Sequence, residues 1–216
     1  MESQVKSKKR VAEHGEVLTG RREVNAMLDL VKAETERIDS RFLEPACGTG
    51  NFLTEILRRK LSVVEDRYGR SRLDYERYAV LAVSSIYGVD ILADNVRECR
   101  QRLFDIFDEA YGRLFGAKTQ DKCRAAVRYI LERNVIHGDA LSLKTVGDRP
   151  RPIVFSEWSP VNGGMLKRRD FMLSFLVEKQ HQHTLFNDEN GEEHLNEPVR
   201  EYPLTHFLEV ADAEER

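Results

Sequence analysis

Three acidic residues each end a short apolar segment, and the first of them is followed by a glycine-rich turn. These acids are Glu44, Asp90 and Asp139, and the glycines of the turn are Gly48 and Gly50. Glycine at such a turn lets the backbone pass close to a ligand without a steric penalty from Cβ. Carboxylates accept hydrogen bonds from amines and hydroxyls. These residue types and their spacing therefore predict a ligand site built from one turn and three acids.

The turn fits one class of ligand better than another. Dinucleotide-binding proteins use Gly-x-Gly-x-x-Gly, and the register that starts at Gly48 places Leu53 at the third glycine position. A nicotinamide-dependent oxidoreductase is therefore the weakest alternative. An acid before the turn suits a ligand with a cationic amino group. S-adenosylmethionine carries such a group, a sulfonium, two ribose hydroxyls that suit Asp90, and an adenine amine that suits Asp139. The alternative for each aspartate taken alone is that it caps a helix.

Apolar periodicity predicts helices and strands that alternate along the chain and could position these residues. We expect helices around residues 23–31, 52–61, 75–81, 94–114 and 123–131, and strands at 41–44, 85–90, 134–139 and 153–155. Such alternation is typical of an α/β protein with a parallel sheet. Ligands of these sheets bind beyond the carboxyl ends of the strands, which is where the three acids fall.

The segment 42–53, FLEPACGTGNFL, resembles the cofactor-binding motif of adenine-specific DNA methyltransferases from restriction–modification systems. Residues 15–19, GEVLT, are similar to the GEVFTP segment of that family. Residues 86–91 and 134–141 match its next two motifs, in the family's order. The resemblance covers residues 13–142. It implies a Rossmann-like methyltransferase fold, with a mostly parallel sheet flanked by helices, over residues 13–177.

The resemblance also assigns roles to individual residues, with S-adenosyl-L-methionine as the cofactor and DNA as the partner. It implies that the amino-acid part of the cofactor is held by Thr19, Glu44, Ala46, Gly48 and Gly50. It implies that the ribose and the adenine are held by Asp90, Ile91, Asp139 and Ala140.

The catalytic signature of that family, Asn/Asp/Ser-Pro-Pro-Tyr/Phe, is missing. Residues 153–162 stand at the expected place and have the sequence IVFSEWSPVN. Two substitutes are open: Ser159-Pro160 as a degenerate remnant, or Glu157 accepting from the target amine while Trp158 stacks on an extruded base. The alternative is that Trp158 is a packing residue and Glu157 a solvated acid.

A basic run and the length of the chain bear on its partners. We expect Lys167, Arg168 and Arg169 to form a cationic loop that contacts the DNA backbone; the alternative is a solvated surface. After residue 170, 46 residues follow, which is too few for a target-recognition domain of typical size. We therefore expect a partner subunit that supplies specificity or catalysis.

Composition excludes several other classes. The chain has 216 residues, 41% of them hydrophobic, and a net charge of −3, which argues against a disordered chain and a wholly basic nucleic-acid coat. Its three cysteines make neither a disulfide framework nor a zinc site, so we expect no metal. Without an apolar run of about 18 residues we expect no membrane segment and a cytoplasmic protein. Residues 1–12 are predicted to be a flexible basic terminus and residues 178–216 a loosely attached polar extension.

Two functions follow as expectations. The first is an N6-adenine DNA methyltransferase, or the methylation subunit of a restriction–modification system. The alternative is a catalytically degenerate module that binds S-adenosylmethionine and scaffolds or regulates a partner. The missing catalytic signature is compatible with both functions, so the sequence alone does not distinguish between them.

Overall fold

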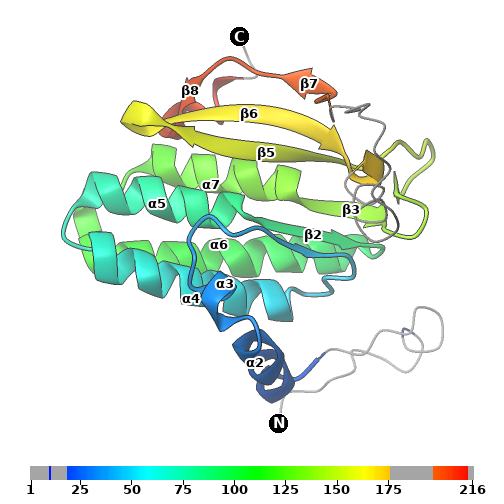
Figure 1. The fold of residues 1–216 in the computed structure, drawn as a ribbon, viewed down its shortest axis with the longest axis horizontal. Helices are drawn as coiled ribbons and strands as arrows, with labels where there is room; N and C mark the ends of the chain where they lie inside the picture. Colours follow the sequence, from blue (N-terminus) through cyan, green and yellow to red (C-terminus); the bar gives the residue numbers. More distant parts are fainter. Residues whose placement is uncertain (1–9, 11–18, 176–196, 214–216) are drawn as a thin grey trace, which may run out of the picture.

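The computed structural model describes residue 10 and the ranges 19–175 and 197–213. These residues form an α/β protein in which long helices pack beside two sheets (Figure 1). The helices are α2 (Arg21–Asp29), α3 (Lys32–Thr35), α4 (Asn51–Tyr68), α5 (Arg72–Ser84), α6 (Ala93–Phe115) and α7 (Asp121–Asn134), with the short 3-10 helices η1 (Gly116–Lys118), η2 (Asn162–Gly164) and η3 (Phe207–Glu209). The strands are β1 (Phe42–Glu44), β2 (Ile86–Asp90), β3 (Val135–Asp139), β4 (Lys144–Thr145), β5 (Val154–Val161), β6 (Met165–Met172), β7 (Arg200–Glu201) and β8 (Thr205–His206).

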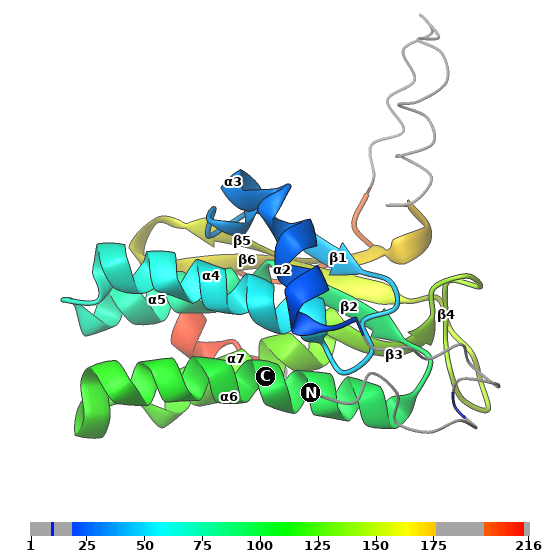
Figure 2. The same cartoon turned by 90° about the horizontal axis from the view of Figure 1, so that it is seen from below.

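Helices α4, α6 and α7 pack through the apolar faces that their periodicity predicts, whereas α5 buries Val80 and its neighbours while Tyr78 and Leu81 of its predicted face are only partly buried. Leu57 of α4, Val80 of α5, Phe107 of α6 and Val127 of α7 are fully buried in one core cluster. Helices α4 and α5 form one layer and α6 and α7 form a second (Figure 2). Burying several large side chains on each helix stabilises the fold by about 1.5–3 kcal/mol per side chain.

The first sheet brings the three acids to one edge. Its order is β1-β2-β3-β4, with β1, β2 and β3 parallel and β4 antiparallel to β3. Glu44 lies opposite Gly88, and Asp90 lies opposite His137. Because the three strands run in the same direction, Glu44, Asp90 and Asp139 all stand at their carboxyl ends. This sheet is compatible with a Rossmann-like arrangement.

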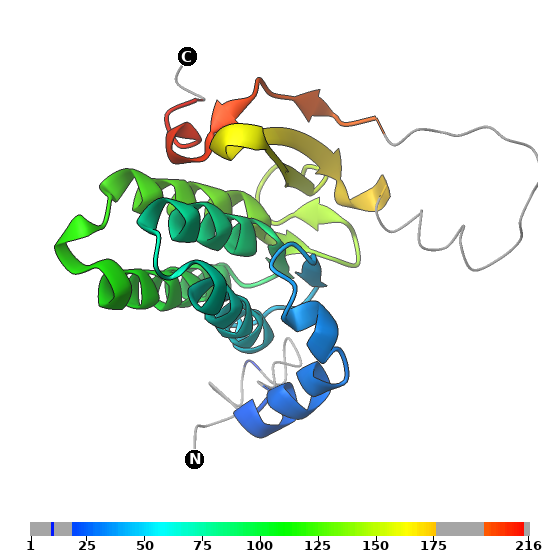
Figure 3. The same ribbon diagram turned by 60° about the vertical axis from the view of Figure 1, so that its left-hand side comes forward.

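The fourth predicted strand does not join the parallel sheet. Residues 153–155 lead into β5, which pairs antiparallel with β6 in a separate sheet, so the expectation of one parallel sheet is wrong here. The hairpin lies over α5 and α7 (Figures 1 and 3). It also packs on the first sheet, where the rings of Tyr87 and Phe155 are 5.3 Å apart and the Tyr87 hydroxyl donates to the carbonyl of Ser156 at 3.0 Å.

A pair of glycines explains the hairpin. Gly163 and Gly164 have φ angles of 76° and 80°, a region that strongly favours glycine. A Cβ on Gly164 would lie 3.3 Å from the ring of Phe207. The chain therefore reverses within a few residues, whereas a further parallel strand would require a crossover connection of a dozen residues or more.

The C-terminal extension is not loosely attached over the part that the structure describes. Strands β7 and β8 both pair with β6. Phe207 and Val210 are 1% and 4% exposed and belong to the main core cluster. Residues 197–213 are therefore part of the domain, while 176–196 and 214–216 lie outside the described residues.

The basic N-terminus is described only at Arg10. Its guanidinium pairs with the carboxylate of Asp94 at 2.5 Å and donates to the side chain of Asn95 at 3.0 Å, at the start of α6. Arg10 is therefore held by the domain, so the prediction of a flexible terminus does not hold at this one residue. The other residues of 1–12, and residues 15–18 of the GEVLT segment, lie outside the described residues.

Two general properties concern membranes and metals. None of the helices in the described ranges is long and apolar enough to cross a bilayer. Over the same part of the chain, no group of three or more His, Cys, Asp and Glu side chains could hold a metal ion. Cys47, Cys99 and Cys123 are buried free thiols.

Candidate cofactor site

The turn between β1 and α4 depends on its two glycines. The φ angle is 52° at Gly48 and 87° at Gly50. A Cβ on Gly50 would lie 2.6 Å from Sγ of Cys99, which is closer than real contacts allow. The amide of Gly50 donates to the carbonyl of Cys47 at 2.8 Å, and its own carbonyl accepts from the amide of Thr54 at 2.8 Å as α4 begins. The glycines thus allow a tight approach of the turn to α6.

Asp90 holds this turn from the neighbouring strand. Its carboxylate is largely buried and accepts from the amide of Gly48 at 2.8 Å. The other oxygen accepts from the amide of Leu92 at 2.9 Å and from the side chain of Asn95 at 3.2 Å. A carboxylate has about four acceptor positions, and these bonds use three. One ribose hydroxyl can therefore bond directly, and a second would displace a protein donor.

Glu44 lies at the end of β1 with its carboxylate half-buried. The amide of Ala46 donates to it at 3.4 Å, a long bond, and no basic side chain in the described ranges pairs with it. Burial raises the pKa of Glu44, and the Ala46 bond lowers it by less. A half-buried carboxylate of this kind is stabilised by a nearby cation.

Asp139 stabilises a turn at the end of β3. It is partly buried and accepts from the amides of Leu141 at 2.9 Å and Ser142 at 3.3 Å. Hydrogen bonding by the Ser142 side chain, and then by the Leu141 amide, lowers the pKa of Asp139. Ala140 follows it, partly buried, and Ile91 is 46% exposed after β2. No helix follows Asp139 before β4, so these bonds belong to a turn and not to a helix cap, and the carboxylate keeps acceptor capacity for a ligand.

Thr19 lies beside the glycine turn through Asn51, the first residue of α4. The side-chain amide of Asn51 donates to the carbonyl of Thr19 at 2.8 Å. Its oxygen accepts from Arg102 at 2.9 Å, and Arg102 also donates to the carbonyl of Thr49 at 2.7 Å. The structure therefore brings Thr19, the turn and α6 together.

Sequence reasoning missed Arg102. It lies on the same face of α6 as Asn95 and Cys99, at steps of four and three residues, and that face meets the glycine turn. The apolar periodicity of this helix predicts that Cys99 is a core thiol, and the side chain of Cys99 is fully buried. The sequence did contain a signal for Arg102, because Asn95 and Arg102 share a helix face with the predicted core residue Cys99.

Cys47 is the turn residue whose chemistry is most altered by its surroundings. Its side chain is 6% exposed and packs on β2, since a Cβ on Gly88 would lie 3.1 Å from its sulfur. Hydrogen bonding to Cys99, followed by burial, raises the pKa of Cys47 far above the usual value for a thiol. The thiol is therefore protonated at neutral pH.

The structure places Trp158 in the core instead of an open base-stacking position. Its indole is 4% exposed and donates to the side chain of Asn134 at 3.1 Å. The rings of Tyr129 and Trp158 pack at an interplanar angle of 72°, with centroids 6.1 Å apart. In this position Trp158 has no free face for a base, so the geometry favours the packing alternative.

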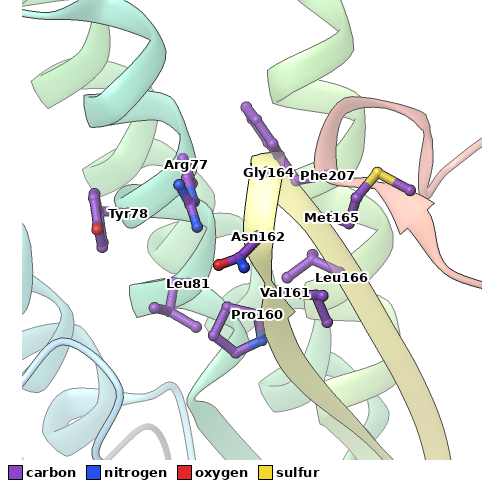
Figure 4. A pocket seen from close by; sticks show the side chains of 10 residues that line it. All are labelled: Arg77, Tyr78, Leu81, Pro160, Val161, Asn162, Gly164, Met165, Leu166 and Phe207. Atoms are coloured by element: carbon purple, nitrogen blue, oxygen red, sulfur yellow. The ribbon is translucent and has the colours of Figure 1, made fainter.

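The other three catalytic candidates are not gathered at the glycine turn. Glu157 pairs with Arg41 and, at 3.1 Å, with Arg169, so it is an ion-paired acid. Ser159 accepts from Arg169 at 3.4 Å. Pro160 lines a pocket near the tip of the hairpin (Figure 4). Because all of them lie in β5, they are spread along an extended strand and do not form a loop.

The predicted cationic loop is also a strand. Lys167, Arg168 and Arg169 lie in β6, and each pairs with a carboxylate. Arg168 is 9% exposed and bonds to Asp170 at 2.9 Å and to the hydroxyl of Tyr129 at 2.7 Å. Pairing inside the domain neutralises this run, so it is not an open phosphate-binding surface.

Comparison with known proteins adds no family to these observations. No protein-family model matches the chain, and neither a curated protein nor a solved structure matches it. The residues and the geometry of the site are therefore the basis for assigning a function.

Proposed function

We propose that this chain is the S-adenosylmethionine-binding subunit of an adenine-specific DNA methyltransferase of restriction–modification type, and that another polypeptide supplies the residues that hold the target base. The observation that carries the proposal is the glycine turn clamped by Asp90, with Glu44 and Asp139 at the ends of the adjacent parallel strands.

The residues present fit this cofactor. Glu44 is a half-buried carboxylate without a basic partner in the described ranges, which suits the ammonium group of the methionine part. The amino terminus of the 18-residue helix α4 favours the carboxylate of that part. Asp90 has acceptor capacity for the ribose. Thr19, Ala46, Gly48 and Gly50 surround the methionine end, and Ile91, Asp139 and Ala140 are the proposed adenine contacts.

The bound cofactor would supply an electrophilic methyl group on its sulfonium. The residues of this chain would bind and orient the cofactor. None of the four catalytic candidates in β5 is held at the glycine turn, and this supports the need for a second polypeptide that positions the target amine.

The free edge of β1 further supports the need for a partner. Within the described chain, β1 pairs with β2 alone, and Leu43 of β1 is 42% exposed. Ligands of open α/β sheets bind in a crevice with strands on both sides. Here one wall of that crevice is present, and an exposed strand edge is a surface on which another chain can pair.

Calorimetry and a transfer assay test the proposal together. We expect the purified chain to bind S-adenosylmethionine and not NADH. With labelled cofactor and mixed-sequence DNA, we expect methyl transfer only when the products of neighbouring genes are added. Absence of cofactor binding, or tighter binding of NADH, would refute the proposal.

The second candidate is a non-catalytic S-adenosylmethionine-binding module. The buried, hydrogen-bonded position of Trp158 favours it, because the best base-stacking candidate of the chain is a core residue. It predicts cofactor binding without transfer in the presence of any neighbouring gene product. Methyl transfer in the presence of a neighbouring gene product would instead support the methyltransferase subunit.

A further inference from the structure

A second concave site lies away from the glycine turn. It is a pocket of about 390 Å³ between α5, the tip of the β5–β6 hairpin and η3 (Figure 4). The hairpin tip is at the opposite end of the molecule from the carboxyl ends of β2 and β3 (Figure 1). Its volume lies within the range of about 300–1,000 Å³ that small-molecule sites occupy.

Most of the side chains that line the pocket are apolar. Leu166 and Phe207 are 5% and 1% exposed and line its inner side, while Val161 at the end of β5 is 38% exposed. Leu81 of α5 completes this wall. The glycine at position 164 lets the hairpin tip lie directly against Phe207. The wall therefore favours a ligand with an aliphatic or aromatic body.

Two polar side chains stand on one side of this wall. Arg77 of α5 and Asn162 of η2 both line the pocket, and the guanidinium of Arg77 points toward the amide of Asn162 (Figure 4). No carboxylate in the described ranges pairs with Arg77. The guanidinium lies 5.6 Å from the ring of Tyr78, and that ring stacks on Tyr68 with centroids 3.8 Å apart. The cation is therefore positioned at an apolar pocket without a counter-ion from the described chain.

We propose that this pocket binds a small organic monocarboxylate, with its carboxylate on Arg77 and Asn162 and its apolar body on Leu81, Val161 and Leu166. A guanidinium is planar and bonds a carboxylate through two parallel N–H groups. One positive charge balances one negative charge, whereas a dianionic phosphate would leave a charge uncompensated. A free acid and the C-terminal residue of a peptide share this chemistry.

Titrations followed by ¹⁵N–¹H NMR of the full chain test the site, with phenylacetate and its neutral analogue phenylacetamide as probes. We expect phenylacetate to shift the amide signals of Asn162, Gly164 and Phe207. Phenylacetamide should bind at least about tenfold more weakly, because it lacks the charge-assisted hydrogen bonds. The tripeptide Gly-Gly-Phe and its C-terminal amide form the second pair of probes, and the tighter of the two acids identifies the source of the carboxylate.

Substitutions inside and outside the pocket test whether phenylacetate binds at Arg77. R77Q should reduce phenylacetate affinity to that of phenylacetamide, and R77K, which keeps the charge, should retain part of the preference. R67Q removes an exposed cation of α4 that does not line the pocket and should change nothing. L81F narrows the pocket and should weaken both probes. Equal affinity for acid and amide, shifts elsewhere in the protein, no shift up to the solubility limit of the acid, or an unchanged preference in R77Q would overturn the proposal.

Discussion

The amide of Gly48 donates to the carboxylate of Asp90 at 2.8 Å, across 42 residues of sequence. This bond ties the turn after β1 to the end of β2. The same carboxylate anchors the entry to α6 through Leu92 and Asn95. One side chain therefore shapes the turn and, in the proposed function, contacts the ribose.

We expect D90A to weaken binding of S-adenosylmethionine at least about tenfold, because charge-assisted hydrogen bonds contribute about 1.5–3 kcal/mol each. Calorimetry measures the affinity, and circular dichroism checks that the variant is folded. The exposed residue Asp148 provides the control D148N, which should bind normally. An unchanged affinity in folded D90A would remove Asp90 from the cofactor site.

We expect Cys47 to react slowly with iodoacetamide at pH 8, because its raised pKa leaves little thiolate. Its rate should rise with pH and fall further when S-adenosylmethionine is saturating, since the cofactor would cover the turn. Peptide mass spectrometry follows alkylation at Cys47, with Cys123, buried away from the turn, as the internal reference. Equal rates at Cys47 with and without cofactor would contradict its placement beside the ligand.

We expect W158A to lower the free energy of unfolding by about 3–5 kcal/mol, since it removes a large core side chain. W158F should destabilise less, mainly by leaving the side-chain oxygen of Asn134 without its donor. Urea unfolding followed by circular dichroism gives both values, and cofactor affinity should stay close to that of the parent. Unaltered stability together with a loss of methyl transfer would instead support the base-stacking role.

A pH-dependent contribution to stability should come from Lys60. It is fully buried, and burial lowers its pKa from 10.5 to about 7, although the ammonium donates to the carbonyls of Arg37 and Ile38 and to the hydroxyl of Ser85. Between pH 7 and 10.5 the unfolded chain therefore binds more protons at this group than the folded chain does. The Lys60 contribution to the free energy of unfolding should rise with pH in that window, by up to about 1.4 kcal/mol per pH unit.

Urea unfolding of the parent and of K60M at pH 7, 8 and 9 isolates this contribution, because the other titrating groups are common to both proteins. The stability difference, parent minus K60M, should increase with pH. Equal pH slopes would mean that the oxygen acceptors keep the ammonium charged in the folded state.

Local sequence was enough to predict the elements that carry the site. The apolar period of α4 and α6, the short strands β1, β2 and β3, and the turn with Gly48 and Gly50 follow from spacing and from residue type. The acids at the strand ends come together because parallel strands end at the same edge. Lys60 of α4 was overlooked, although a lysine inside an apolar stripe has to be buried among acceptors or disrupt the packing.

The tertiary structure decided what lies beyond β3. A short apolar segment such as 153–155 forms a strand in either a parallel or an antiparallel sheet, and its partner is a non-local choice. Here the Gly163-Gly164 turn and the pairing of β7 and β8 with β6 fixed that choice. As a result, Trp158 lies in the core, and the basic residues 167–169 form ion pairs within the domain. Residue type and spacing determine which chemistry a segment can offer, but burial and charge pairing depend on neighbours brought from elsewhere in the chain.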